Sequence, residues 1–385
     1  MRNKLLARLI IIRRAIHQYP ELGNREFRTA VLIEKTLKGL GIKIKRIAKT
    51  GVVGILEGSK RPGKGKVIAF RADMDALPIE EKTNKPYASR RKGIMHACGH
   101  DANTAMVLGS AMILSREKKN FTGTVKFIFQ PNEESSGGAK EMIRAGVLRK
   151  PSPDAIIGIH VNPWLKSGLL GLKRGAMMAA VDKFTIEVFG EGGHGAYPNF
   201  AKDSIVIMSQ IINALQTIVS RELSPLEPAV VSVGSIKGGE AFNIIADKVT
   251  AVGTVRTLNN GLRRMIRSKI EKKAKNIASM NDAKCRVAYE KLGGALVNSN
   301  WVVELCRKAG ECVLGKKGVA FLDKPSMGGE DFAEYLAFVP GCFIYLGTKK
   351  GTNAFPWHHE RFDVDETALP KGSFVLAEIA KSFLK

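Results

Sequence analysis

The sequence predicts an α/β protein whose main domain contains a largely buried mixed sheet and is interrupted by a smaller, ferredoxin-like α+β domain. Helix-like and strand-like segments alternate over residues 1–178, which is typical of an α/β domain. Over residues 179–292 the segments follow the order β-α-β-β-α-β of a split βαβ unit. Helix-like and strand-like segments alternate again over residues 293–385. A chain of 385 residues is longer than one hydrophobic core usually supports. We therefore expect a main domain made of both ends of the chain, with the middle part inserted.

Hydrophobic periodicity and short apolar runs define the elements of the main domain. Helical patterns in its first part cover residues 4–18, 25–40, 103–116 and 139–148. Strand-like runs there cover residues 52–56, 67–70, 125–129 and 155–161. A last helix is expected over residues 366–384.

The inserted domain is predicted from alternating strand patterns and two long helical patterns. Its strands are expected over residues 183–189, 229–236, 248–257 and 283–290. Its helices are expected over residues 203–220 and 260–279, and the second of them is rich in Lys and Arg. Such a helix suits a solvated face.

The composition is that of an ordinary globular protein, with 44% hydrophobic and 25% charged residues. No apolar run approaches the roughly 20 residues that a membrane helix needs. The basic start leads into an apolar run at residues 9–12, but Arg13 and Arg14 interrupt it and no small-residue cleavage site follows. We therefore expect an amphipathic first helix and a cytoplasmic protein that does not bind membranes.

The formal net charge of +25 permits two interpretations. A nucleic-acid-binding protein would gather this charge on a recognisable motif. Here the Lys and Arg residues are spread along the whole chain, and no RNP, KH, zinc-finger or helix-turn-helix pattern is present. The charge therefore indicates solvated surfaces, and we expect no nucleic-acid partner.

The densest group of metal-binding residue types is the segment 96–101, His-Ala-Cys-Gly-His-Asp. Cys98 and His100 are two residues apart, so in an extended backbone their side chains face the same side. Gly99 allows close approach, and the segment lies at a strand-to-helix junction, where α/β enzymes place ligands. The alternative is a buried cysteine beside a hydrogen-bonded histidine. The other cysteines are scattered and suggest reduced structural thiols, because no disulfide framework or zinc motif emerges from their spacing.

Three further segments add candidate ligands, each at the end of a strand-like run or in a loop after one. They supply one of two adjacent acids, one histidine in an apolar strand, and one of two adjacent loop histidines: Glu133 or Glu134, His160, and His358 or His359. Alone, each also fits a structural role, such as an acidic turn or a core histidine. Together with Cys98 and His100 they offer sulfur, nitrogen and oxygen donors.

Such a mixed donor set suits Zn²⁺ or a neighbouring first-row cation, whereas Mg²⁺ and Ca²⁺ prefer oxygen alone. Five ligands are too many for one tetrahedral ion. They fit two ions about 3.5–4 Å apart that share a bridging ligand and a water. The sequence therefore predicts a two-metal site.

Ordered motifs along nearly the whole chain resemble the aminoacylase/carboxypeptidase superfamily of two-metal peptidases. The resemblance is to the branch of hippurate hydrolase, indole-acetyl-amino-acid hydrolases and N-acyl-amino-acid amidohydrolases. The motifs that carry it are HQYPELGNREFRTA (17–30), FRADMDALPIEE (70–81), MHACGHD (95–101), FQPNEE (129–134), GIHV (158–161), GGHGAYP (192–198), GGEAFNIIAD (238–247), GTVR (253–256), MGGEDFAEY (327–335) and WHHERFDVDE (357–366).

The resemblance implies a metallopeptidase catalytic domain that binds two divalent ions per subunit, which could be Zn, Mn, Co or Ni. The implied ligands are Cys98, His100, Glu134, His160 and His358. Cys98 would be a bridging thiolate, and Glu133 would be the general base for the hydrolytic water. Asp73 and Asp75 would orient the ligands.

The resemblance also implies that the inserted domain is a lid and dimerisation domain. His194 would stabilise the oxyanion, delivered from the partner subunit. Asn243 and Arg256 would bind the substrate carboxylate, for which a guanidinium is well suited. We accordingly expect a homodimer or a higher oligomer.

The implied reaction is hydrolysis of the amide bond of an N-acyl amino acid or small peptide, which releases a free amino acid. Carboxypeptidases on short peptides and deacetylases of N-acetyl-diaminopimelate share these motifs and stay open as alternatives. Asn103, Asn199, Ala246 and Glu360 depart from the family's commonest residues, which leaves the acyl pocket and the substrate preference open. A metal-binding pseudoenzyme is a further alternative, and the presence of Glu133 argues against it.

Overall fold

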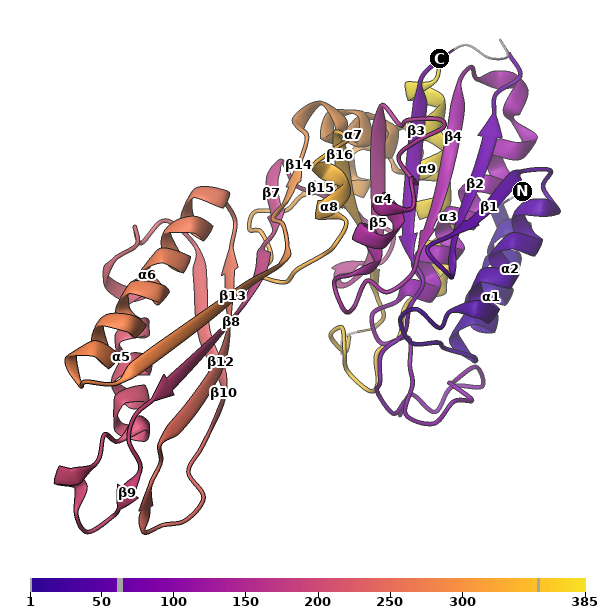
Figure 1. The fold of residues 1–385 in the computed structure, drawn as a ribbon. Helices are drawn as coiled ribbons and strands as arrows, with labels where there is room; N and C mark the ends of the chain where they lie inside the picture. The colour runs from indigo at the N-terminus through magenta and orange to yellow at the C-terminus, as the bar shows by residue number, and fades with distance from the viewer. Residues whose placement is uncertain (1, 61–64, 352–353) are drawn as a thin grey trace. The chain divides into compact units, whose positions relative to one another are not determined.

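The computed structural model describes residues 2–60, 65–351 and 354–385. Contacts divide the chain into two compact units, each with its own hydrophobic core (Figure 1). The first unit consists of Met1–Gly175, Val297–Lys324 and Asp331–Lys385. The second unit consists of Ala176–Leu296 and Pro325–Glu330.

An eight-stranded mixed sheet forms the centre of the first unit, in the order β1-β2-β4-β3-β5-β16-β6-β15. Its strands are β1 Lys43–Ile47, β2 Gly51–Glu57, β3 Val67–Asp73, β4 Thr124–Gln130, β5 Ala155–Lys166, β6 Leu170–Leu172, β15 Val319–Phe321 and β16 Gly341–Lys349. β4, β3, β5 and β16 run parallel to one another, whereas β1, β2 and β4 pair antiparallel. β3, β4 and β16 are buried almost throughout, as expected for parallel strands covered on both faces.

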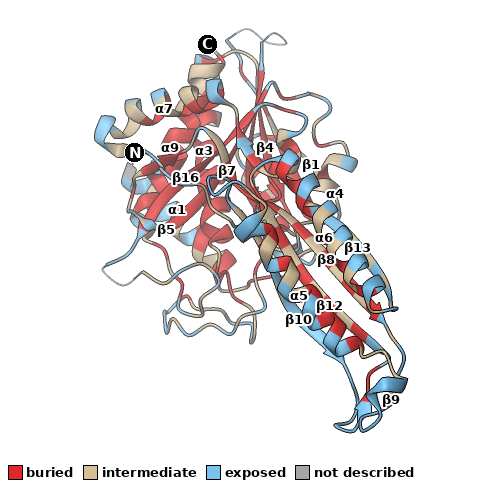
Figure 2. Cartoon of the chain, turned by 90° about the vertical axis from the view of Figure 1, so that its left-hand side faces the viewer, coloured by how far each residue is buried: buried red, intermediate tan, exposed pale blue. Residues whose placement is uncertain are grey.

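The helices of the first unit pack around this sheet. They are α1 Arg2–His17, α2 Phe27–Lys38, α3 His100–Arg116, α4 Gly138–Arg144, α7 Asn300–Leu314, α8 Ala333–Leu336 and α9 Leu369–Phe383, with 3₁₀ turns at Lys118–Asn120, Lys316–Gly318 and Glu366–Ala368. α3 packs against α1 and α9 and is buried over nearly its whole length (Figure 2). Within the described residues, no helix has both the length and the apolar composition needed to cross a membrane.

A buried ion network connects α1 to α3 and to the segment before α9. The Arg13 guanidinium is fully buried, and its Nε donates to Asp101 Oδ2 at 2.7 Å. Its two terminal nitrogens donate to Glu366 Oε1 and Asp363 Oδ1, each at 3.3 Å. His17 Nδ1 also lies 2.7 Å from Asp101 Oδ2. One arginine therefore ties the first helix to residues almost 90 and about 350 positions away.

Arg13→Met is expected to lower the free energy of unfolding by about 3–5 kcal/mol, because it leaves the buried Asp101 carboxylate without its guanidinium partner. Urea denaturation followed by circular dichroism measures this change. Arg8→Met is the matched control, since Arg8 lies exposed on the same helix and its replacement should change stability by about 0.5 kcal/mol or less. Equal stability of the two variants would contradict this role for Arg13.

The second unit contains a four-stranded antiparallel sheet in the order β10-β12-β8-β13, covered by two helices. Its elements are β8 Ala180–Phe189, α5 Ser204–Arg221, β10 Ala229–Gly238, β12 Lys248–Thr257, α6 Asn260–Met280 and β13 Lys284–Gly293. Asp203 and Asn259 begin the two helices by accepting backbone N–H groups of the first turn. The remaining short elements are β7 Gly175–Met178, β9 Gly193–His194, β11 Ile244–Ile245, β14 Leu296–Asn298 and the 3₁₀ turn Pro198–Phe200.

The chain order β8-α5-β10-β12-α6-β13 is the split βαβ arrangement that the sequence predicts. The mixed sheet of the first unit likewise confirms the predicted α/β class. One predicted helix is too long: the pattern at 139–148 predicts a helix to Leu148, but α4 ends at Arg144. The chain turns there because Gly146 adopts a φ of 85°, outside the helical region.

Candidate metal centre

The candidate ligands gather where the parallel strands of the first unit end. Asp73 and Gln130 are the last residues of β3 and β4, and His160 lies in β5. The chain enters α3 at His100 through Gly99, whose φ of 88° lies in the left-handed region that glycine adopts without strain. Open α/β sheets place their ligand sites at this edge.

Two of the groups of candidate donor atoms share Cys98. Ligand atoms of Cys98, His100 and His160 lie within 4.8 Å of one another. Ligand atoms of Cys98, Glu134 and His358 form a second group of the same span. The arrangement therefore offers two adjacent positions for a cation, with the Cys98 sulfur common to both.

Unpaired buried atoms in these groups indicate that the donor set fits a metal. His100 Nε2 and Glu134 Oε1 are buried, lie 3.7 Å apart, and lack a hydrogen-bond partner among the described residues. Buried polar atoms without a partner cost free energy and are rare in folded proteins. A cation bound between them would satisfy both atoms.

Hydrogen bonds fix which ring nitrogen each histidine presents. His100 Nδ1 donates to the backbone oxygen of Asp75 at 2.9 Å, and His160 Nδ1 donates to the backbone oxygen of Val161 at 2.8 Å. Both rings therefore present Nε2 to the site, and His160 Nε2 lies 3.6 Å from Cys98 Sγ. Partners of this kind set the tautomer and orientation of metal-binding histidines.

Burial and neighbouring charges set the protonation states of these groups. Burial, followed by the Glu134 charge, raises the pKa of the Cys98 thiol well above its ordinary value. Burial lowers the pKa of His160 to about 4, so its ring is neutral at pH 7. Burial also disfavours the charged form of His100, but Asp73 and Cys98 outweigh it and keep the His100 pKa well above normal. Because a metal-bound thiol is deprotonated, cation binding here must release the Cys98 proton.

The structure separates the two adjacent histidines that the sequence leaves as alternatives. His358 Nε2 lies 3.4 Å from Glu134 Oε2, within the second group of donors. His359 stacks on Phe355 with 4.6 Å between the ring centroids, and its Nδ1 accepts the N–H of Arg361. His358 has a φ of 63°, so the backbone turns at this residue and the two side chains diverge.

Residues 69–382 match the sequence model of peptidase family M20/M25/M40. The chain belongs to this family. An N-acetyl-L-cysteine deacetylase of Bacillus subtilis (strain 168) is 44% identical over 384 residues, which cover 99% of this chain and 89% of the relative. The hippurate hydrolase of Campylobacter jejuni is 39% identical over 375 residues, which cover 97% of this chain and 96% of the relative. The solved structure of Bacillus subtilis YxeP, a dinuclear metal binding peptidase from the M20 family, has a TM-score of 0.86, 36% identity and 99% coverage of both chains.

Membership of the M20/M25/M40 family confirms the predicted resemblance and the prediction of a metal-dependent hydrolase. The YxeP structure shows that the family includes dinuclear metal-binding proteins. In this chain, candidate ligand groups for a metal lie at the edge of the main sheet.

Of the other predicted site residues, Glu133 lies in the loop between β4 and α4, with a carboxylate oxygen within 4.8 Å of ligand atoms of His100 and Glu134. The remaining three lie in the second unit. His194 is exposed on β9, and the N–H of the following Gly195 donates to the backbone oxygen of Asn243 at 2.8 Å. His194 and Asn243 both line a hollow of about 940 Å³, together with Lys237 and Glu240. Arg256 lies on β12, half-buried, and is not among the residues lining this hollow.

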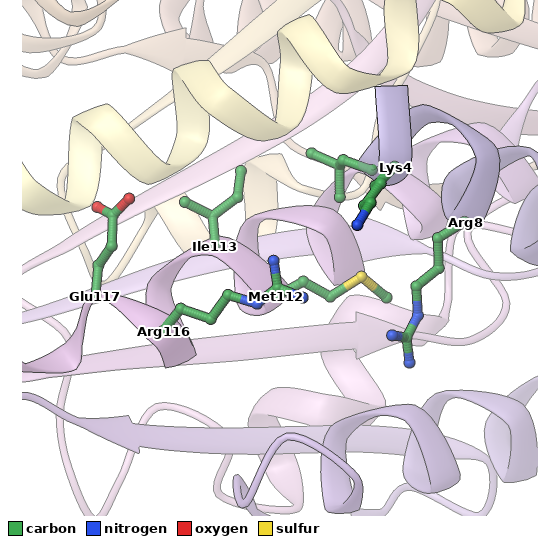
Figure 3. Close-up of a pocket in the computed structure, with 7 residues that line it drawn as sticks. Lys4, Arg8, Met112, Ile113, Arg116 and Glu117 are labelled. Atoms are coloured by element: carbon green, nitrogen blue, oxygen red, sulfur yellow. The ribbon is translucent and has the colours of Figure 1, made fainter. Parts of the chain in front are cut away.

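A second hollow, of about 260 Å³, lies on the first unit between α1 and α3. It is lined by Leu5, Arg8 and Met112, among others. Figure 3 labels Lys4, Met112, Ile113 and Arg116 among its lining residues. None of the predicted site residues is among the described residues that line it. This surface hollow is therefore not part of the candidate metal centre.

Sequence reasoning missed a hydrogen-bonded cluster of three residues, two of which contact predicted site residues: Arg71 contacts Asp73, and Asp331 contacts Glu133. Arg71, Gln130 and Asp331 lie within motifs that carry the family resemblance, but no role was predicted for them. All three are buried and hydrogen-bonded to one another. A signal was available in Arg71 and Gln130, because charged and amide side chains inside otherwise apolar strands need buried partners.

Proposed function

We propose that this enzyme hydrolyses the amide bond of N-acyl amino acids or small peptides and releases a free amino acid. The observation that carries the proposal is the pair of donor groups sharing Cys98, with the Glu133 carboxylate within 4.8 Å of ligand atoms of His100 and Glu134. Two relatives are named for N-acetyl-L-cysteine and hippurate, both of which are N-acylated amino acids. A thermostable carboxypeptidase of Saccharolobus solfataricus, 39% identical, favours small peptides as the second candidate. Deacetylation of N-acetyl-diaminopimelate is a third.

We further propose that the site binds two divalent ions per subunit, Zn, Mn, Co or Ni. The proposed ligands are Cys98, His100, Glu134, His160 and His358. When bound, such a pair of ions polarises the scissile carbonyl and activates the attacking water. Asp75 and Asp73 would hold the His100 ring in place. A thiolate ligand is sensitive to oxidation, so we expect the enzyme to work in the reducing cytoplasm.

Glu133 is the proposed general base. Its carboxylate takes a proton from the attacking water as the new carbon–oxygen bond forms. The same carboxylic acid then gives the proton to the amine nitrogen as the carbon–nitrogen bond breaks. Glu133 is thereby returned to its starting state, and the products are a carboxylic acid and an amine.

The inserted domain, residues 179–292, is the proposed lid and dimerisation domain, and the enzyme is a proposed homodimer. His194 would stabilise the oxyanion in the partner subunit's site, which its exposure on β9 permits. Asn243 and Arg256 would bind the substrate carboxylate. A two-fold dimer would place both copies of His194 symmetrically.

A substrate panel tests the proposed function. Metal-free protein is loaded in turn with Zn²⁺, Mn²⁺, Co²⁺ or Ni²⁺ and offered N-acetyl-L-cysteine, hippurate, N-acetyl-diaminopimelate and short peptides, and release of the free amine is measured. We expect at least one metal to support turnover of an acylated amino acid, and metal-free protein to be inactive. Absence of hydrolysis with two ions bound per chain would exclude the proposal.

Subunit mixing tests the role of His194. His194→Ala and Glu133→Gln chains, each expected to be inactive alone, are mixed and allowed to exchange. If His194 serves the partner, a mixed dimer contains one intact site and one doubly damaged site, so activity should recover toward one site per mixed dimer. If heterodimers confirmed by native mass spectrometry stay inactive, His194 acts within its own chain.

A further inference from the structure

One buried carboxylate joins the two ends of the loop that carries Glu133 and Glu134. This loop, residues 131–137, connects the last residue of β4, Gln130, to the first residue of α4. Asp331, which is 2% exposed, accepts Gln130 Nε2 at 2.8 Å on Oδ1 and at 2.9 Å on Oδ2. Its Oδ2 also accepts the backbone N–H of Ala139, in the first turn of α4, at 2.9 Å.

The same residue also contacts the proposed general base. The backbone N–H of Asp331 donates to Glu133 Oε1 at 3.4 Å. Asp331 is thus in contact with the residue before the loop, the second residue of the helix after it, and the carboxylate within it. These partners lie 192 to 201 positions from Asp331 in the chain.

The loop has a conformation that needs external support. Asn132 and Ser136 both have a φ of 56°, in the left-handed region that non-glycine residues adopt at a cost of about 1–3 kcal/mol. Such conformations persist where surrounding contacts determine them. The bonds from Asp331 to both ends of the loop supply contacts of this kind.

Arg71 connects Asp331 to Asp73, which lies near the proposed ligand His100. Arg71 Nη2 donates to Asp331 Oδ1 at 2.8 Å, and its Nη1 donates to Asp73 Oδ2 at 2.7 Å. Asp73 Oδ2 lies 3.9 Å from His100 Nε2. Arg71 and Asp73 are fully buried, and buried charge networks of this kind often stabilise a fold no better than apolar packing. Because Arg71 and Asp73 link the contacts of Glu133 to those of His100, we infer that they position the site rather than stabilise the fold.

We propose that Asp331 is a positioning residue, which fixes the Glu133 carboxylate relative to the proposed metal ligands by closing the loop 131–137. This inference rests on the proposed role of Glu133 as general base. A misplacement of about 1 Å at a reacting group can lower turnover about 10²-fold, so small displacements of the loop are sufficient to matter.

Asp331→Asn tests this role while keeping the shape of the side chain. Asn Oδ1 can still accept from Arg71 and Gln130, but its Nδ2 meets the N–H of Ala139, so two donors face each other. We expect kcat to fall about 10²-fold, with KM and the number of bound metals unchanged. Ala139→Pro removes the N–H that Asp331 accepts and places a proline ring carbon against Asp331 Oδ2, at a first-turn position that tolerates proline, and should lower kcat about 10-fold. Asp154→Asn is the matched control, because Asp154 also accepts a backbone N–H, that of Val67, at the opposite end of β3, and it should retain full activity.

A double-mutant cycle separates positioning of Glu133 from a general structural effect. If Asp331 acts through Glu133, then Asp331→Asn should lower turnover in the wild-type background and leave the residual turnover of Glu133→Gln unchanged. A further loss in the Glu133→Gln background, a loss of metal, or wild-type kcat in both Asp331→Asn and Ala139→Pro would each overturn the inference. If Glu133→Gln itself keeps wild-type activity, the proposed function of Glu133 fails, and this inference fails with it.

Discussion

Glu133→Gln is expected to leave the metal content unchanged and to lower kcat by about 10²–10⁴-fold, the range typical of a lost general acid–base group. Glutamine has nearly the same shape as glutamate, so it can still accept the N–H of Asp331. Its amide cannot take a proton from water and return it to the leaving amine. Steady-state kinetics on the best substrate of the panel, together with elemental analysis of the purified protein, measures both effects.

Glu134→Gln is the matched control for this experiment. Glu134 lies in the donor group with Cys98 and His358, so its replacement should weaken metal binding, and excess metal should restore part of the activity. The adjacent positions should therefore give opposite phenotypes: full metal content without turnover at Glu133, and reduced metal content at Glu134. An exchange of these phenotypes would reverse the roles proposed for the two acids.

Cys98→Ala is expected to abolish stable binding of both ions and therefore all activity. The reason is that Cys98 belongs to both proposed donor groups, the one with His100 and His160 and the one with Glu134 and His358. We expect alanine to leave the surrounding fold intact, because the described side-chain partners of Cys98 are His100, Glu134 and His160, all within the candidate centre. Metal stoichiometry by elemental analysis and thermal unfolding of the metal-free protein test the two parts of this expectation.

Cys312→Ser provides the control, because Cys312 is exposed and lies on α7, outside the candidate centre. It should retain metal and activity. In wild-type protein, calorimetric titration with metal in buffers of different ionisation enthalpy should show proton release, as the raised pKa of the Cys98 thiol requires. Two ions bound per chain in Cys98→Ala would disprove the bridging role.

The sequence predicts many elements of the fold by range, but α7, β16 and several shorter strands had no predicted range. β1 has the sequence Lys-Ile-Lys-Arg-Ile, in which the two apolar residues are three positions apart, and it pairs with β2 at the edge of the sheet. Such a strand is formed by its neighbour more than by its own residues, because β propensity depends strongly on context. β6 and β15 have three residues each and are likewise too short for periodicity to detect.

The candidate ligands could be proposed from the sequence because they lie within short motifs, such as residues 96–101. The choice between His358 and His359 needed coordinates or the family pattern, since adjacent residues in a loop carry the same sequence signal. The contacts of Asp331 could not be predicted: its partners Arg71 and Gln130 are 260 and 201 positions away, and only the folded chain brings them together. Motifs indicate which residues matter, whereas long-range packing determines what they contact.

The position of β16 constrains the order in which the chain can acquire its structure during synthesis. β16, Gly341–Lys349, lies between β5 and β6 in the sheet, although β5 and β6 are separated by only three residues in the sequence. While the ribosome is still making the preceding 340 residues, the exposed backbone of β5 therefore has no partner on that side. The four-stranded sheet and the two helices between Ala180 and Gly293 meet no such delay, because all the strands of that sheet lie within that stretch. The middle of the polypeptide can therefore fold first. The unit that bears the proposed ligands can complete its sheet only when about the last tenth of the chain is synthesised. Until then, the unpaired edge of β5 can bind chaperones or aggregate.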